Sequence, residues 1–136
     1  AEDMAVFRRV CPDRRYPKGK PIFHLGDPAL DLHIIAQGQV KLSVPTASGS
    51  ERIVAVCGAG DFIGESFLTE AARYRVDAVP LTDVVSCPVG RGQFLQLALK
   101  APTLVLTFAE ILADHLFDCR SQLSASYAPV KARLLG

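Results

Sequence analysis

The hydrophobic pattern divides the chain into a central region of short strands and a C-terminal helical region. From Pro21 to Val89, short apolar and β-branched runs are separated by glycines at positions 26, 38, 49, 58, 60 and 64. Short strands at regular intervals, bounded by turn residues, are typical of a jelly roll or barrel. We therefore predict a mainly β domain with flanking helices, folded as a jelly roll or a closed barrel.

One predicted strand of this region alternates strictly between apolar and polar residues. Val40, Leu42 and Val44 are apolar, whereas Lys41 and Ser43 are polar. Because successive side chains of a strand point to opposite faces, we expect the apolar set to face the core and the polar pair to face solvent. Residues 46–50 read as a hairpin turn that leads into a second strand at 52–56.

The pattern changes to a helical one near Gly92. Residues 94–99 suit a short helix, and Pro102 suits the first turn of a new helix that continues without glycine or proline to about residue 124. A further short helix is predicted at 3–11, where Pro12 ends the amphipathic pattern.

The long helix carries a wide apolar arc. Six positions follow spacings of three and four, and they are Val105, Phe108, Leu112, His115, Cys119 and Gln122. Two interpretations are open: the arc packs only on its own β domain, or one side of it also pairs with a second copy of the chain. We favour the second and predict a homodimer held by these six residues.

The composition limits the classes of function. With 136 residues the chain is large enough for one core, and 15 Lys and Arg against 14 Asp and Glu leave no basic field that would attract DNA. No apolar run has the length of a membrane span, and the N-terminal residues lack the apolar core of a secretory signal. These features predict a cytoplasmic protein that does not bind membranes.

The candidate metal ligands and nucleophiles do not form a recognisable site. Cys11, Cys57, Cys87 and Cys119 include no close pair, and the three histidines include no His-x-His motif. We therefore expect ordinary thiols in a reducing compartment, no metal site and no enzymatic activity.

Three segments carry a resemblance to a known family. Tyr16–Asp27 and Ile35–Leu42 resemble the first barrel strands of the cAMP receptor protein/FNR superfamily of transcription regulators. The run Gly60-Asp-Phe-Ile-Gly-Glu65, followed ten residues later by Arg75, is similar to the phosphate-binding cassette of cyclic-nucleotide-binding domains. The resemblance extends from about residue 7 to residue 135.

The resemblance implies a ligand site built on the cassette. It assigns ligand contacts to Gly64, Glu65, Ser66, Arg75, Val76, Cys119 and Arg120. Backbone N–H groups after Gly64 and the guanidinium of Arg75 would bind an anion, and Glu65 would accept a hydrogen bond from the ribose 2′-hydroxyl. The implied ligand is a small anionic effector, either a cyclic nucleotide such as cAMP or a different anion, and no other cofactor is assigned.

Several alternatives stay open at this point. Glu65 and Arg75 could pair with each other across an empty cavity, and Arg73 competes with Arg75 as the anion clamp. Nucleotide-binding relatives usually have a small or hydroxyl residue after the cassette arginine, whereas this chain has Val76 and then Asp77. Cys119 and Arg120 replace the two hydroxyl residues that reach adenine in cAMP receptor proteins. The alternative function is an orphan or a redox- or gas-sensing regulator domain.

The same resemblance predicts the organisation of the chain. Residues 1–100 would form the cyclic-nucleotide-binding-like β-barrel, a double-stranded β-helix (jelly roll) with short flanking helices. Residues 101–126 would form the dimerisation helix, and residues 127–136 a hinge and the start of a winged helix-turn-helix domain that is missing. The chain would thus be the effector-sensing half of a bacterial transcription regulator. Its partners would be a second copy, a small-molecule effector and, only through the missing domain, DNA.

Overall fold

The computed structural model describes residues 12–126, with side chains described as far as Phe117. The elements in chain order are β1 (Arg14–Tyr16), β2 (Asp31–Gln37), β3 (Val40–Pro45), β4 (Glu51–Cys57), β5 (Phe62–Ile63), the 3-10 turn η1 (Glu65–Leu68), β6 (Asp77–Pro80), β7 (Val84–Gly90), α2 (Arg91–Lys100) and α3 (Pro102–Ser126). Two compact units divide between Gln96 and Leu97, so the β region and the C-terminal helical region are treated separately.

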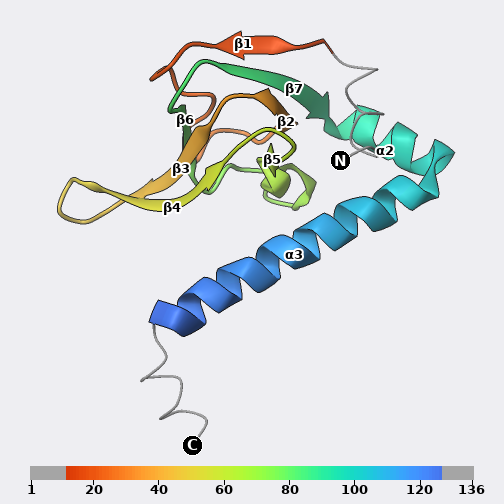
Figure 1. The fold of residues 1–136 in the computed structure, drawn as a ribbon. Coiled ribbons are helices and arrows are strands. Elements are labelled where there is room, and N and C mark those ends of the chain that lie inside the picture. The colour runs from red at the N-terminus through yellow and green to blue at the C-terminus, as the bar shows by residue number, and fades with distance from the viewer. Residues whose placement is uncertain (1–11, 127–136) are drawn as a thin grey trace, which may run out of the picture. The chain divides into compact units, whose positions relative to one another are not determined.

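The strands form two antiparallel sheets. One sheet has four strands in the order β1-β7-β2-β5, and the other has three in the order β4-β3-β6 (Figure 1). The crossovers between non-consecutive strands fit the predicted jelly-roll fold, and the mainly β class with C-terminal helices is confirmed. The sheets are open, however, so the domain is not a closed barrel.

The core lies along the two central strands of the larger sheet. β7 is buried from Val84 to Val89, and β2 buries Leu32 and Ile34. Apolar residues on both faces of these strands explain why their sequences read as continuous runs rather than as alternations. Cys87 is fully buried here and is disulfide-bonded, so the prediction of an ordinary thiol is wrong at this position.

The alternation predicted for residues 40–44 holds only in part. Val40 is fully buried and Leu42 is half-buried, but Ser43 is also buried, with 1% of its surface exposed. The pairing of β3 with β4 shifts register between Leu42 and Ser43, and such a bulge turns the next side chain toward the other face. The Ser43 hydroxyl is satisfied because it donates to Glu51 Oε2 at 3.0 Å.

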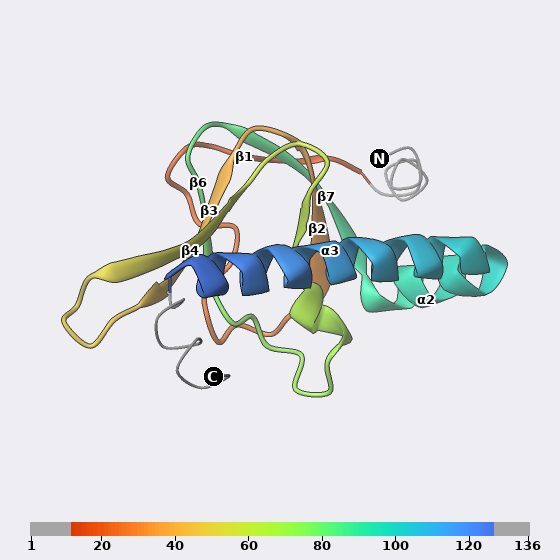
Figure 2. The ribbon, with the colours of Figure 1, turned by 60° about the horizontal axis from the view of Figure 1, so that its bottom comes forward.

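The C-terminal unit contains the predicted long helix, which begins at Pro102 as expected. Figure 2 shows α2 followed by a sharp turn into α3. Along α3, Leu104 and Phe108 are buried, whereas Val105, Leu106, Leu116 and Phe117 are exposed. The side chains of Cys119 and Gln122 lie outside the described set, as do the predicted helix at 3–11 and the predicted hinge at 127–136.

No single helix of the described chain is both long and apolar enough to cross a bilayer. Only α2 and α3 taken together have the length and apolar composition of a span, and a sharp bend separates them.

Candidate functional site

The cassette begins where β5 ends at Gly64. This glycine has a φ of 83°, in the left-handed region, and a Cβ built on it would lie 2.8 Å from Tyr74 Cε1. Glycine is therefore required both by the backbone conformation and by the approach of the tyrosine ring. The following turn, η1, is anchored by buried Phe67, whose ring meets that of Phe94 edge-on at 5.6 Å.

The turn leaves two backbone donors free of its own hydrogen bonds. The first N–H to bond back is that of Phe67, which donates to the Gly64 carbonyl at 3.1 Å. The N–H groups of Glu65 and Ser66 precede it and have no acceptor within the turn. Backbone donors of this kind favour an anion.

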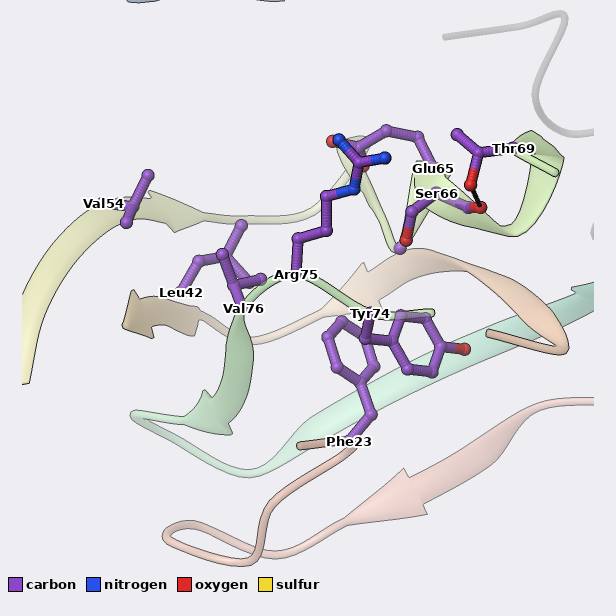
Figure 3. Close-up of a pocket in the computed structure, with 10 residues that line it drawn as sticks. Phe23, Leu42, Val54, Glu65, Ser66, Thr69, Tyr74, Arg75 and Val76 are labelled. Atoms are coloured by element: carbon purple, nitrogen blue, oxygen red, sulfur yellow. Dashed lines mark hydrogen bonds between the residues drawn. The ribbon is translucent and has the colours of Figure 1, made fainter. Parts of the chain in front are cut away.

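A cavity of about 270 Å³ lies against this turn. Its lining consists of Phe23, Leu42, Val54, Gly64, Glu65, Ser66, Thr69, Tyr74, Arg75 and Val76 (Figure 3). Leu42, Val54 and Val76 supply apolar walls, and the polar groups gather at the cassette. Its size is near the lower end of the roughly 300–1,000 Å³ of small-molecule pockets.

The structure brings Arg75 and Glu65 to one cavity without pairing them. Figure 3 shows the Arg75 side chain extending toward the turn that carries Glu65 and Ser66. Among the described side chains, neither Arg75 nor Glu65 has an ion pair or hydrogen bond, and the Ser66 hydroxyl has no hydrogen bond. The Glu65–Arg75 ion pair considered as an alternative is absent, so both charges are available to a ligand.

Arg73 has a different role from Arg75. Its Nη1 donates to the Gly26 carbonyl at 2.8 Å, and the residue does not line the cavity. Of the two candidate clamps, Arg75 is the one that the fold places beside the cassette.

Tyr74 is a cavity residue that the sequence interpretation missed. Its ring stacks on Phe23 with centroids 3.7 Å apart and planes 8° from parallel, and its hydroxyl donates to the Asp31 carbonyl at 2.7 Å. Burial raises the pKa of Tyr74 to about 12, so the phenol stays protonated and keeps donating. The one available signal in the sequence was its position between Arg73 and Arg75, the two candidate anion clamps.

Comparison with known proteins agrees with this geometry. Residues 13–101 match the cyclic nucleotide-binding domain family. The chain belongs to this family. It is 33% identical over 120 residues to the cyclic AMP receptor protein of Thermus thermophilus, a match that covers 88% of this chain and 54% of that protein. The chain thus spans about half the length of this curated relative.

Solved structures of family relatives have the same fold. The Thermus thermophilus catabolite activator protein superposes with a TM-score of 0.78 at 30% identity, covering 91% of this chain and 58% of that one. The N-terminal domain of a transcriptional regulator from Streptomyces coelicolor gives a TM-score of 0.70 at 26% identity, covering 86% of this chain and 84% of that one. The resemblance to regulators of the cAMP receptor protein type is confirmed.

Two departures from the cyclic nucleotide-binding pattern follow Arg75. Val76 contributes an apolar wall instead of a hydroxyl donor. Asp77 does not line the cavity: its Oδ1 accepts the Leu25 N–H at 2.7 Å and lies 3.8 Å from His24 Nδ1. The negative charge of Asp77 is therefore used outside the ligand site.

The remaining candidate residues are Cys57 in the β region and Cys119 and Arg120 on α3. Burial, together with the negative charges of Asp61 and Glu65, raises the pKa of Cys57 to about 11, which disfavours the reactive thiolate. The side chains of Cys119 and Arg120 lie outside the described set. Among the described residues, no group of three or more His, Cys, Asp and Glu side chains could hold a metal ion.

Proposed function

We propose that the chain is the effector-sensing and dimerisation part of a bacterial transcription regulator, and that its cavity binds a small anion of the cyclic-nucleotide class. One observation carries this proposal: Arg75 lines the cavity beside the free N–H groups of η1 and forms no ion pair with Glu65. A guanidinium and backbone donors at one end of an apolar cavity suit a phosphate attached to a less polar body.

Each polar group has a distinct partner in such a ligand. The guanidinium of Arg75 neutralises the single charge of a cyclic phosphate and donates two parallel hydrogen bonds, while the N–H groups of Glu65 and Ser66 donate to the same oxygens. Glu65 then needs a donor of its own, because a desolvated carboxylate without one is costly. A ribose hydroxyl supplies that donor, and the walls formed by Leu42, Val54 and Val76 suit the sugar and base.

Titration calorimetry with cAMP and with cGMP tests the proposal on the wild type, on Arg75→Ala and on Arg73→Ala. Loss of a charged hydrogen bond costs about 1.5–3 kcal/mol, so Arg75→Ala is expected to weaken binding at least about tenfold. Arg73→Ala is the matched control, because it removes the same charge two residues away from a side chain that bonds Gly26 instead of facing the cavity.

Two outcomes contradict the proposal. Absence of heat with both nucleotides would exclude them as effectors and favour the orphan or redox alternative. Equal weakening by the two substitutions would show that Arg75 acts only through the general charge of the domain.

The dimer forms through α3 in this proposal. Of the predicted seam positions, Val105 is 42% exposed, whereas Phe108 is buried in the single chain. Leu106 and Phe117 are 61% and 69% exposed, but they lie on another face of the helix because they fall outside the three- and four-residue spacings of the seam. The predicted seam of Val105, Phe108, Leu112, His115, Cys119 and Gln122 runs along the same helix. The same proposal divides the chain into a ligand-binding domain at 1–100, a dimerisation helix at 101–126 and a hinge at 127–136. In this proposal DNA is bound only by a further domain.

A further inference from the structure

The β region contains a second chamber, of about 290 Å³, beyond the Phe23–Tyr74 stack. These two residues line both spaces, so the stacked rings form a wall between the cassette cavity and the chamber. The chamber is otherwise built from different residues, among them Arg14, Tyr16, Asp27, Asp31 and His33. None of these five belongs to the ligand site proposed above.

His33 is the buried polar group of the chamber. Only 4% of its surface is exposed, and its Nδ1 lies 3.0 Å from the hydroxyl of fully buried Ser86 on the neighbouring strand. The antiparallel register of β2 and β7 brings these two side chains to one face of the sheet. Within the described part of the chain, Nε2 has no hydrogen bond, which leaves it as the ring nitrogen that an occupant can reach.

The imidazole of His33 is neutral at physiological pH. Burial, followed by the nearby Arg14 charge, lowers its pKa to about 4. When Nδ1–H donates to Ser86, the neutral ring offers the Nε2 lone pair as an acceptor, so its natural partner is a donor such as an amine.

The remaining charges of the chamber have a negative balance. Asp27 and Asp31 contribute two carboxylates against the one guanidinium of exposed Arg14. Asp27 already accepts the His24 N–H at 3.0 Å, whereas the Asp31 carboxylate has no hydrogen bond or ion pair in the described part of the chain. The aromatic walls add to the attraction of a cation, because ring faces are negative.

We propose that this chamber is a second ligand site, which takes a small primary ammonium compound with an apolar body. The ammonium group donates to His33 Nε2 and to the Asp31 carboxylate, and the apolar body contacts the rings of Tyr16 and Phe23. Two sources share this chemistry: a simple amine, and an amino acid whose own carboxylate would pair with Arg14.

The test follows the His33 ring nitrogens by nitrogen-15 NMR while benzylamine, L-phenylalanine or benzoate is added to the full chain without nucleotide. We expect benzylamine to shift the Nε2 resonance in a saturable way and benzoate to leave it unchanged. The experiment needs no binding at the cassette, so its outcome is independent of the calorimetry with cAMP and cGMP.

Asp31→Asn and Glu110→Gln are the variant and its matched control. Asp31 is half-buried and its backbone, not its carboxylate, holds the Tyr74 hydroxyl, so the amide should fold. Asp31→Asn is expected to weaken the binding of benzylamine at least about fivefold. Glu110→Gln removes an exposed charge from α3 and should change nothing.

The outcomes distinguish a simple amine from an amino acid as the ligand, and they also show whether the second ligand site exists. Tighter binding of L-phenylalanine than of benzylamine, removed by Arg14→Gln, identifies an amino acid; equal or weaker binding identifies a simple amine. The proposal is overturned if no amine shifts His33 at millimolar concentration, if benzoate binds as well as benzylamine, or if Asp31→Asn binds like the wild type.

Discussion

Replacing Gly64 by alanine isolates the role of the tyrosine ring in shaping the cassette. The added methyl group would lie 2.8 Å from Tyr74 Cε1, 3.2 Å from the Asp31 carbonyl oxygen and 3.5 Å from Phe23 Cε2. Tyr74 cannot simply turn away, because its ring is stacked on Phe23 and its hydroxyl is bonded to Asp31. The methyl group therefore forces the cassette backbone or the stacked pair to move.

Two costs add in Gly64→Ala. A non-glycine residue at a φ of 83° costs about 1–2 kcal/mol, and overpacking against a fixed ring costs a further 1–3 kcal/mol or so. We expect the free energy of unfolding to fall by about 2–5 kcal/mol. Nucleotide affinity should fall as well, since the same backbone carries the Glu65 and Ser66 N–H groups.

Gly60→Ala is the matched control for the backbone cost. Gly60 has a φ of 92°, but a Cβ there would have no atom within 4 Å, so only the conformational term applies. Urea denaturation of both variants gives the difference, which should be about 1–3 kcal/mol. The reasoning is refuted if the two variants lose equal stability, or if Gly64→Ala costs as much in a Tyr74→Ala background, where the ring is gone.

Three further outcomes are expected. The pKa of His33 is lowered from 6.5 to about 4 in the folded chain, so between these pH values the unfolded chain binds one proton more. The free energy of unfolding should therefore fall by about 2 kcal/mol from pH 7 to pH 5. Urea denaturation should show a smaller fall in His33→Gln. Cys57, with its pKa raised from 9.0 to about 11, should react with iodoacetamide at pH 8 about a hundredfold more slowly than an ordinary thiol, as peptide mass spectrometry can measure, and unfolding should abolish the difference. Val105→Glu should shift the chain toward monomer in sedimentation velocity experiments, and an unchanged dimer, or a monomeric wild type, would contradict the α3 interface.

The fold class could be predicted because its signals are local. Glycine-punctuated β-branched runs and a proline at the start of a long helix act within a few residues, and β4 and α3 lie where the pattern placed them. The exposure of Ser43 was predicted wrongly because a bulge depends on the partner strand β4, which no pattern within residues 40–44 reveals. The disulfide of Cys87 was missed for a similar reason, since pairing of distant cysteines is set by tertiary structure.

The part of the candidate site that lies in one stretch of sequence could be predicted, whereas the part contributed by distant segments could not. Gly64, Glu65, Ser66 and Arg75 form a recognisable motif, and the fold gathers all four around one cavity. The opposite wall comes from segments distant in sequence, so Phe23 carried no signal. Whether a charge faces the cavity also depends on partners elsewhere, as Asp77 shows by bonding the Leu25 N–H.

Tyr74 connects the two chambers of the β region. It is covalently next to Arg75, its ring touches the backbone path at Gly64, and its hydroxyl holds the strand residue Asp31. If both proposed sites are occupied, a ligand that moves Arg75 in one cavity would act on a wall of the other, and an occupant of the second chamber would act on the cassette through the same ring. Such coupling must be reciprocal in free energy, so an amine that strengthens nucleotide binding would be bound more tightly by the nucleotide-loaded chain by the same factor. Its size is limited by how differently each ligand binds the two positions of the stacked rings, because a ligand that binds both equally shifts neither.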